Sequence, residues 1–312
     1  MIQAKAPSTA DRYSRAFNEF KRWASDYDEI TTLPATSSSI ALYLEHLIES
    51  NCSFSKLESA LYGINWAHNI YGLNSPCESG LVKHIFEAGK RKLSKPTIKK
   101  EPVTLEMILG ICSKYAAPNA NLSDLRLAAL CVTAFNGFLR FNELASIRCC
   151  DVQFCHNDSS SFVELSILKS KTDIYRDGAK VLLAQTNDIC CPFNLLLRYV
   201  KASNINLSSC EPFFRNLQFV KSNNSYILRS DGMSYTRTRE IVLAAFESLG
   251  YPKEKFGLHS LRSGGATAAA NAGVSDRLFK RHGRWKSETA KDGYVKDKLE
   301  SLLSVSRSIN KK

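Results

Sequence analysis

The sequence lacks any run of about 18 apolar residues, which is the length that a membrane-spanning helix needs. Its first stretch, MIQAKAPSTADRYSR, lacks the apolar centre of a signal peptide. We find no internal repeat. With 44% apolar and 23% charged residues the composition is that of an ordinary soluble globular protein, and 312 residues suit two domains better than one core. We therefore expect no membrane partner.

Cysteine pairs at metal-binding spacing are also missing. The ten cysteines, without a secretion signal, indicate reduced intracellular thiols rather than disulfides. The stretch CCDVQFCH offers Cys149, Cys150, Cys155 and His156 as possible zinc ligands. Structural zinc sites usually separate paired ligands by about two to four residues, and no second pair follows at such spacing. We therefore expect no metal site and interpret these cysteines as small apolar residues in and around a strand.

Acidic residues are in deficit, with 30 Asp and Glu against 42 Lys and Arg, a net charge of +12. Residues 1–89 hold seven basic and ten acidic residues, whereas KRKLSKPTIKK, residues 90–100, holds six basic residues and no acid. Residues 280–312 hold ten basic and four acidic residues. This excess favours a polyanionic partner, most simply nucleic acid, although a solvated basic surface without a partner is the alternative.

Helical periodicity dominates the first 92 residues, where four amphipathic segments predict a small bundle. Residues 93–103, LSKPTIKKEPV, hold two prolines and three lysines but few large apolar groups, which is typical of a linker. We therefore predict a helical domain over residues 1–92, a basic linker over 93–103 and a second domain over 104–312.

The second domain has one β segment among helical patterns. Strands are predicted at 151–155, 162–168 and 179–184, with the turn YRDG, 175–178, joining the last two as a hairpin. Further helices are predicted at 104–116, 123–135, 191–200, 236–249, 260–272, 275–282 and 287–304. The predicted fold class is mainly α with one small antiparallel β-sheet.

Two arginines stand out by their context. Arg140 follows a glycine-containing break in GFLRFNEL, residues 137–144, and precedes a helical pattern. His259 and Arg262 lie one helical turn apart in HSLRSGG, so both can face one point. Each residue alone is explained more simply as an ion pair, a cap or a buried histidine, but their combination indicates a site.

Five motifs occur in a fixed order: GFLRFNEL, ILKSKTD, HSLRSGG, GRWKS and the lone Tyr294. Their order and spacing, over about residues 130 to 296, resemble the tyrosine recombinase (phage integrase-like) family. The first domain and the linker are similar to the family's helical core-binding (SAM-like) DNA-binding domain. The last stretch, RHGRWKSETAKDGYVKD, looks most like recombinases of eukaryotic mobile elements of the Crypton, DIRS and Ngaro types.

The resemblance implies a role for each motif residue. Tyr294 would attack a DNA phosphodiester, and Arg140 and Arg262 would hold its non-bridging oxygens, as planar guanidinium forks can. His259 would move a proton to or from the nucleophile or donate to a phosphate oxygen. Glu143, three residues after Arg140, would hold the His or Arg in place.

The resemblance assigns a role less directly to two further positions, the tryptophan before Tyr294 and the lysine of the hairpin. Trp285, nine residues before Tyr294, stands where many members have histidine; its indole can donate one hydrogen bond but cannot shuttle a proton, so we expect it to orient the phosphate. The family's lysine, which protonates the leaving 5′-oxygen, lies on the hairpin. Lys169 and Lys171 share one strand face, so alternation does not separate them. We favour Lys171, with Lys169 contacting a phosphate nearby.

Basic and polar side chains around these motifs are candidates for DNA contact. Those of the linker region could follow a phosphate backbone, and those that open the helix near residue 235 could bind a phosphate or simply cap the helix. The candidates are Lys90, Arg91, Lys92, Lys95, Lys99, Lys100, Lys169, Tyr235, Arg237, Arg239, Arg281, Arg284 and Lys286.

The resemblance implies a site-specific DNA recombinase that works through a 3′-phosphotyrosine without metal, ATP or other cofactor. Its expected partners are double-stranded DNA and further copies of the chain, a homodimer on one site and a homotetramer in synapsis, with the tail at 295–310 docking in cis or in trans. We expect it in the nucleus if the chain comes from a eukaryotic mobile element, and otherwise in the cytoplasm. The alternatives are a topoisomerase IB-like nicking-closing enzyme and a domesticated DNA-binding protein without strand transfer.

Overall fold

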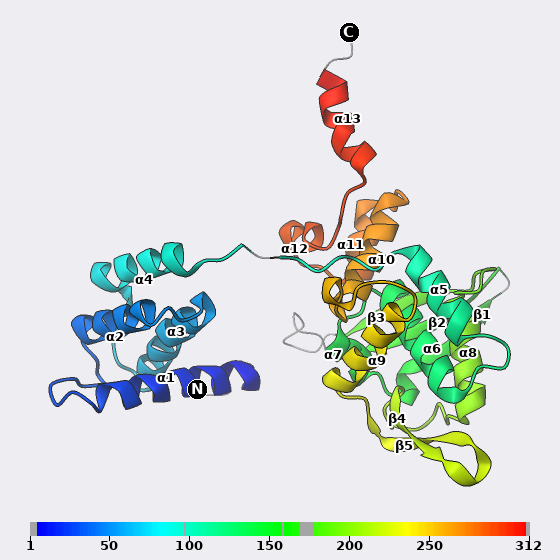
Figure 1. The fold of residues 1–312 in the computed structure, drawn as a ribbon, viewed down its shortest axis with the longest axis horizontal. Helices are drawn as coiled ribbons and strands as arrows, with labels where there is room; N and C mark the ends of the chain where they lie inside the picture. The colour runs from blue at the N-terminus through cyan, green and yellow to red at the C-terminus, as the bar shows by residue number, and fades with distance from the viewer. Residues whose placement is uncertain (1–4, 97, 158, 169–177, 310–312) are drawn as a thin grey trace. The chain divides into compact units, whose positions relative to one another are not determined.

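The computed structural model describes residues 5–96, 98–157, 159–168 and 178–309 (Figure 1). The chain divides into two compact units, Met1–Ile98 and Lys99–Lys312. This division lies inside the linker predicted at residues 93–103. None of the described helices is both long and apolar enough to cross a membrane.

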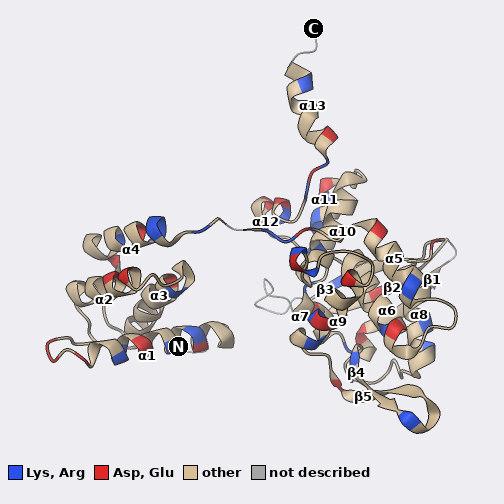
Figure 2. Ribbon diagram, in the orientation of Figure 1, with Lys and Arg blue, Asp and Glu red and all other residues tan. Residues whose placement is uncertain are grey.

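The first unit is a helical bundle. Its helices are α1 (Pro7–Ala24), α2 (Ser37–Glu49), α3 (Phe54–Ile70), the short 3₁₀ helix η2 (Pro76–Glu78) and α4 (Gly80–Leu93). Hydroxyls of Thr36, Ser53 and Ser79 accept hydrogen bonds from backbone N–H groups in the first turns of α2, α3 and α4. The ribbon of α4 ends in basic residues (Figure 2), and its last turn holds Lys90, Arg91 and Lys92.

The second unit begins with helices and continues into the sheet. Its elements up to the sheet are α5 (Leu105–Tyr115), α6 (Leu122–Asn136), α7 (Phe141–Ser146), η3 (Cys149–Asp151), β1 (Val152–Asn157), β2 (Ser160–Ile167) and β3 (Ala179–Ala184). The three strands form an antiparallel sheet in the order β1-β2-β3, and Ile167 pairs with Ala179 as the last residue pair of β2 and β3. The fold class, mainly α with a small antiparallel sheet, is confirmed.

The rest of the second unit holds two differences from the predicted elements. It comprises α8 (Pro192–Ser203), β4 (Arg215–Val220), η4 (Lys221–Asn223), β5 (Ser225–Gly232), α9 (Tyr235–Glu247), η5 (Lys253–Lys255), α10 (His259–Asn271), α11 (Asp276–Gly283), α12 (Glu288–Asp292) and α13 (Leu299–Ile309). The hairpin of β4 and β5 is a second sheet that we did not predict. The single helix predicted at 287–304 is wrong, because α12 ends at Asp292 and α13 starts only at Leu299.

Helix α6 is the centre of the second unit, and every residue from Leu125 to Phe135 is buried. Helix α10 approaches α6 and the backbone at Val103 closely, because it has a glycine at each contact. A Cβ on Gly265 would lie 1.9 Å from the carbonyl oxygen of Phe135, and one on Gly264 would lie 2.2 Å from that of Val103. The small residues of HSLRSGG therefore set the depth at which α10, with His259 and Arg262 in its first turn, packs against α6.

We expect Gly265→Ala to destabilise the second unit by about 1–3 kcal/mol, because the added methyl group must push α10 away from a backbone carbonyl. Urea unfolding followed by circular dichroism measures this loss. The matched control is Gly257→Ala, where a Cβ would meet nothing within 4 Å. Equal unfolding midpoints for the two variants would contradict the close approach.

Candidate active site

Arg140 is presented by a sharp turn between two helices. Helix α6 ends at Asn136, Phe138 adopts the left-handed conformation with φ 46°, and Arg140 then stands at the N-cap of α7. The backbone N–H of Arg140 donates to Oε2 of Glu143 at 3.0 Å, and its Nη1 donates to Oε1 at 2.7 Å. One carboxylate thus fixes both the backbone and the guanidinium of Arg140.

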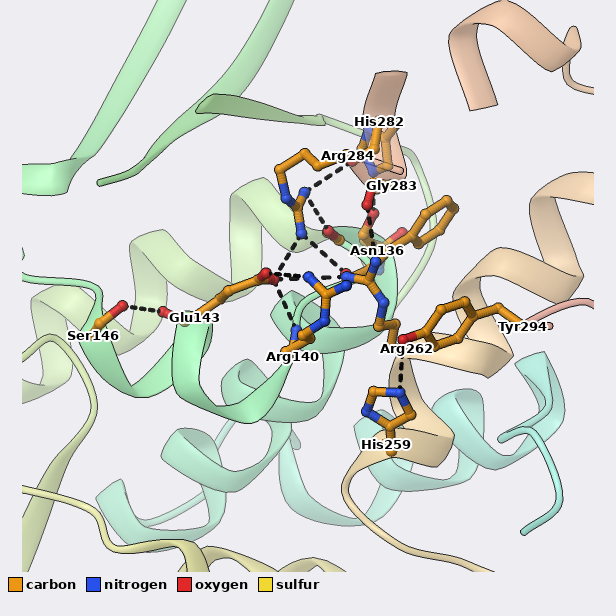
Figure 3. Close-up of polar contacts among 12 residues, drawn as sticks. Asn136, Arg140, Glu143, Ser146, His259, Arg262, His282, Gly283, Arg284 and Tyr294 are labelled. Atoms are coloured by element: carbon orange, nitrogen blue, oxygen red, sulfur yellow. Dashed lines mark hydrogen bonds and ion pairs between the residues drawn. The ribbon is translucent and has the colours of Figure 1, made fainter. Parts of the chain in front are cut away.

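The Glu143 carboxylate also meets two further arginines (Figure 3). Its Oε2 lies 2.9 Å from Nη2 of Arg284 and 3.6 Å from Nη1 of Arg262, and its side chain is 1% exposed. Burial acts to raise the pKa of this carboxyl, but the surrounding guanidiniums of Arg284, Arg140 and Arg262 outweigh burial and lower the pKa. Glu143 is therefore an ionised counter-ion shared by three cations.

Arg262 lies at the bottom of the site with no exposed surface. Its Nη1 donates to the carbonyl oxygen of Phe138 and its Nη2 to that of Gly283, the latter at 2.9 Å. Burial, and then the neighbouring Arg140, lower the pKa of Arg262 to about 10, so its guanidinium stays protonated at neutral pH. Its central carbon lies 4.8 Å from the ring centre of Tyr294 and 5.1 Å from that of Trp285, so both rings cover it.

Tyr294 and His259 form the polar contact next to this guanidinium. The phenol oxygen of Tyr294 lies 3.0 Å from Nε2 of His259, the first residue of α10 (Figure 3). The backbone of Tyr294 is held from both sides, since its N–H donates to Lys291 O at 3.1 Å and its carbonyl accepts from Thr267 Oγ1 at 3.2 Å. A phenol in contact with an imidazole and above a guanidinium has the surroundings that a tyrosine nucleophile needs.

Trp285 supports the tyrosine from the side. The indole is 6% exposed and packs against Phe138, Phe279 and Tyr294, with ring centres 6.0, 4.9 and 5.5 Å away. A Cβ on Gly283 would lie 1.9 Å from the indole, so only glycine leaves room for it. Its Nε1 is buried and finds no acceptor within the described part of the chain. The indole is therefore placed to buttress Tyr294 and has one donor to offer a ligand.

Lys291 is a residue of the site that the sequence analysis missed. It belongs to the short helix α12, and its Nζ pairs with Asp276 at the start of α11 and with Glu288 at 2.5 Å. Lys280 of α11 also contacts Glu288, at 2.5 Å. These ion pairs fasten α12, and with it the segment that leads to Tyr294, onto α11. In the sequence the same residues read as an ordinary solvated charge run, which is why they gave no signal.

No protein-family model matches the chain. The integrase/recombinase xerD homolog of Selenomonas ruminantium is 26% identical over 297 residues, which cover 94% of this chain and 82% of that protein. Among solved structures, the XerH site-specific recombinase bound to palindromic difH substrate in a post-cleavage complex aligns with a TM-score of 0.63 at 15% identity, over 95% of this chain and 78% of that one. The chain has the fold of the tyrosine recombinases.

A second structure of this fold leads to the same result. A lambda integrase dimer bound to a COC′ core site aligns with a TM-score of 0.55 at 16% identity, over 94% of this chain and 73% of that one. The resemblance drawn from the five motifs is thus confirmed at the level of the tyrosine recombinase fold. The comparisons do not test the closer affiliation with Crypton, DIRS and Ngaro elements.

The predicted lysines Lys169 and Lys171 lie outside the described residues. Both belong to the stretch of chain between β2 and β3, and Ile167 and Ala179 define the strand pair that this stretch connects. The assignment of Lys171 as the proton donor of a tyrosine recombinase therefore stays a prediction.

The candidates for DNA contact fall into two groups. Arg284 is not at the rim of the site: its side chain is 9% exposed and its guanidinium points inward to Glu143, so the predicted surface contact is corrected. The remaining described candidates are exposed: Lys90, Arg91, Lys92, Lys95, Lys99, Lys100, Tyr235, Arg237, Arg239, Arg281 and Lys286. At the start of α9 the hydroxyl of Ser234 accepts from the backbone N–H of Arg237 at 3.2 Å, so ordinary capping is present there.

A cavity of about 270 Å³ adjoins Tyr294. Lys99, Lys100 and Lys296 line it together with Ser263 and Tyr294. Two of the predicted linker lysines thus lie beside the tyrosine, where a basic wall suits an anionic ligand. Among the described residues no group of His, Cys, Asp or Glu is arranged to hold a metal ion.

We expect Glu143→Gln to destabilise the protein by about 3–5 kcal/mol, because it leaves three close guanidiniums without their buried counter-ion. Chemical unfolding with and without sulfate measures this effect, and sulfate should stabilise the variant more than the wild type by replacing the lost anion.

The matched control for this change is Glu240→Gln, whose partner Arg237 is 3.5 Å away on the exposed face of α9. An exposed pair of this kind contributes about 0–1 kcal/mol. A Glu143→Gln variant as stable as Glu240→Gln would show that the carboxylate does not hold the arginines together.

Proposed function

We propose that the chain is a site-specific DNA recombinase that cuts and rejoins DNA strands through a 3′-phosphotyrosine intermediate. The observation that carries this proposal is the contact of the Tyr294 phenol with His259 Nε2 at 3.0 Å, directly above the Arg262 guanidinium. Arg140 adds a second guanidinium, which the shared Glu143 holds from behind. A nucleophile, a proton acceptor and two anion-binding forks therefore meet at one point.

The reaction follows from these groups. The Tyr294 oxygen forms a bond to phosphorus while the bond from phosphorus to the 5′-oxygen breaks. The phenol proton passes to His259, and the leaving 5′-oxygen takes a proton from Lys171, the predicted general acid, and becomes a free 5′-hydroxyl. Charge that develops on the non-bridging oxygens is met by Arg140 and Arg262. A 5′-hydroxyl of a partner strand then attacks the phosphotyrosine and releases Tyr294. The phosphotyrosine conserves the energy of the phosphodiester, so the exchange requires no ATP, and two guanidiniums take the place that metal ions hold in other phosphoryl-transfer sites.

Arg140 is the first of the two arginines that a phosphate can reach. Its side chain is 18% exposed, and among the described residues its guanidinium contacts no acceptor except Glu143. Arg262 is covered by the Tyr294 and Trp285 rings; its Nη1 and Nη2 donate to carbonyl oxygens, and its Nε has no acceptor among the described residues. A scissile phosphate must therefore move the Tyr294 ring off Arg262, which is the movement that frees the phenol oxygen for attack.

Double-stranded DNA is the proposed substrate, bound by a homodimer on one site and by a homotetramer in synapsis. The lambda integrase structures support this proposal, one a dimer bound to a core site and another a tetramer bound to a Holliday junction. Helix α13 has no buried residue in this structure and exposes Leu299, Leu302 and Val305. We assign this helix to docking within the assembly, on a neighbouring subunit or on its own.

We further propose that the chain is a recombinase of a eukaryotic mobile element of the Crypton, DIRS or Ngaro type and acts in the nucleus. The stretch RHGRWKSETAKDGYVKD, residues 281–297, supports this affiliation. Strand exchange between the ends of a mobile element and chromosomal DNA would then give integration or excision.

The nucleophile can be tested by covalent trapping. Nicked suicide duplexes tiled across the DNA on either side of the gene that encodes the chain should yield an adduct with the wild-type protein in EDTA. We expect no adduct with Tyr294→Phe, because the variant keeps the ring and loses the attacking oxygen. Denaturing electrophoresis and peptide mapping measure the linkage.

The matched control is Tyr251→Phe, a partly buried tyrosine that packs against the core of the same unit beside Phe256. An adduct of undiminished yield with Tyr294→Phe would contradict the assignment. Supercoil relaxation by the wild type without recombinant product would identify a topoisomerase-like enzyme instead, and the absence of any adduct would favour a DNA-binding protein without strand transfer.

The proton donor can be tested with a modified leaving group. We expect Lys171→Ala to slow cleavage about 100- to 10,000-fold, the usual contribution of a general acid. A 5′-bridging phosphorothioate should restore the rate, because a thiolate leaves without a proton. Single-turnover cleavage of both substrates measures this, and rescue of Lys169→Ala in place of Lys171→Ala would assign the role to Lys169.

A further inference from the structure

The backbone at Arg284 is unusual. Helix α11 ends at Gly283, and Arg284 follows in the left-handed conformation with φ 57° and ψ 37°. Side chains with a Cβ adopt this conformation at a cost, so glycine or asparagine is the common choice at the end of a helix. Three of the five described non-glycine residues with positive φ are asparagines, and the other two are Phe138 and Arg284. Both of these lie in the active site, which points to a local reason for the strain.

The guanidinium of Arg284 supplies that reason. Its Nη1 donates to the carbonyl oxygens of His282 and Gly137, at 2.8 and 3.2 Å. Its Nη2 donates to the carbonyl oxygen of Phe138 at 3.1 Å and to Oε2 of Glu143 at 2.9 Å. The side chain thus ties the loop before Trp285 to the turn before Arg140, two segments far apart in the sequence (Figure 3).

Two of the four acceptors of Arg284 belong to groups that also hold the proposed phosphate-binding arginines. The Glu143 carboxylate receives Arg140 on its other oxygen, and the Phe138 carbonyl oxygen also receives Arg262. Arg284 therefore fixes one partner of each guanidinium without reaching the surface itself. A lysine could not do this, because a single ammonium group cannot span four acceptors in a plane as a guanidinium fork does.

We propose that Arg284 is a positioning residue that orients Arg140 and Arg262 for the scissile phosphate and makes no contact with DNA. The proposal rests on the proposed function, because it concerns the same site. It predicts that the left-handed backbone serves to turn the guanidinium inward. The usual helix-ending glycine would then relieve the backbone strain at position 284 but slow cleavage.

The test is Arg284→Gly, measured by single-turnover adduct formation at saturating suicide duplex, by DNA affinity over a series of salt concentrations and by thermal unfolding. We expect adduct formation to slow about 10- to 100-fold, as loss of a supporting contact typically does. DNA affinity and its salt dependence should not change. Arg284→Lys should be equally slow, and added guanidinium ion should partly restore the rate of Arg284→Gly but not of Arg284→Lys.

The matched control is Asn204→Gly, which makes the same exchange at the left-handed C-cap of α8, where φ is 51°. This variant should cleave at the wild-type rate. A wild-type rate for Arg284→Gly would show that the residue only ends a helix and would overturn the proposal. So would weaker DNA binding with a salt dependence reduced by about one counterion, which is the mark of a phosphate contact.

Failure of this proposal differs from failure of the proposed function. A wild-type protein that forms no adduct contradicts strand cleavage itself. A wild-type protein that forms the adduct, beside an equally fast Arg284→Gly, contradicts only the role of Arg284. If Arg284→Gly does not fold, Arg284→Lys, which keeps the positive charge, decides the question. Slow cleavage by Arg284→Lys supports a positioning role of the guanidinium fork, and a wild-type rate shows that Glu143 needs only a positive charge.

Discussion

The buried carboxylate of Glu143 is the interaction on which the rest of the site depends. Three guanidiniums close together in a poorly hydrated place would repel one another and open the fold. The carboxylate sits within 3.6 Å of all three and neutralises one of the charges. A net positive charge remains, and it is aimed at the place that Tyr294 covers. A phosphate that enters this place supplies the anion the site still lacks, so the same electrostatic balance that holds the fold together prepares it for its ligand.

Close backbone packing makes this arrangement rigid. Gly264 and Gly265 let α10 approach α6, and Gly283 lets the indole of Trp285 lie flat on the end of α11. Arg262 and Trp285 are thereby fixed by backbone atoms that have little freedom to move. Tyr294 is different, because it follows the five-residue helix α12, which is too short to be stable alone and is held by ion pairs of Lys291. The arginines of the site are thus held by close packing, whereas the helix that precedes Tyr294 is held by ion pairs.

The sequence predicted the site residues that belong to motifs in a fixed order along the chain. It missed residues whose role depends on the direction in which the backbone points their side chain. Arg140, His259, Arg262 and Tyr294 were found from motif order, and the structure brings all four together. Arg284 was taken for a surface contact, because a basic residue beside others gives no sign that a left-handed backbone turns it inward. The β4–β5 hairpin was missed because much of its surface is exposed, Phe219 and Ile227 included, so its alternation of apolar and polar residues is weak. The break between α12 and α13 covers residues 293–298, GYVKDK, where Thr267 hydrogen-bonds to the backbone of Tyr294 and of Lys296, a contact that the sequence pattern does not reveal.

The position of Tyr294 over Arg262 has a consequence for the order of events. A guanidinium with no exposed surface cannot be the first group to meet DNA, whereas Arg140 retains donors on its exposed side. A phosphate captured by Arg140 would lie next to the ring of Tyr294 and compete with it for the positive charge of Arg262. The cation–π contact is worth about 0.5–2 kcal/mol, less than a charge-assisted pair of hydrogen bonds to phosphate, so in the proposed reaction a phosphate would displace the ring. On the proposed function, this displacement would move the phenol oxygen from its contact with His259 toward the phosphorus. On the proposed function, the ring of Tyr294 would thus keep Arg262 covered until a phosphate arrives.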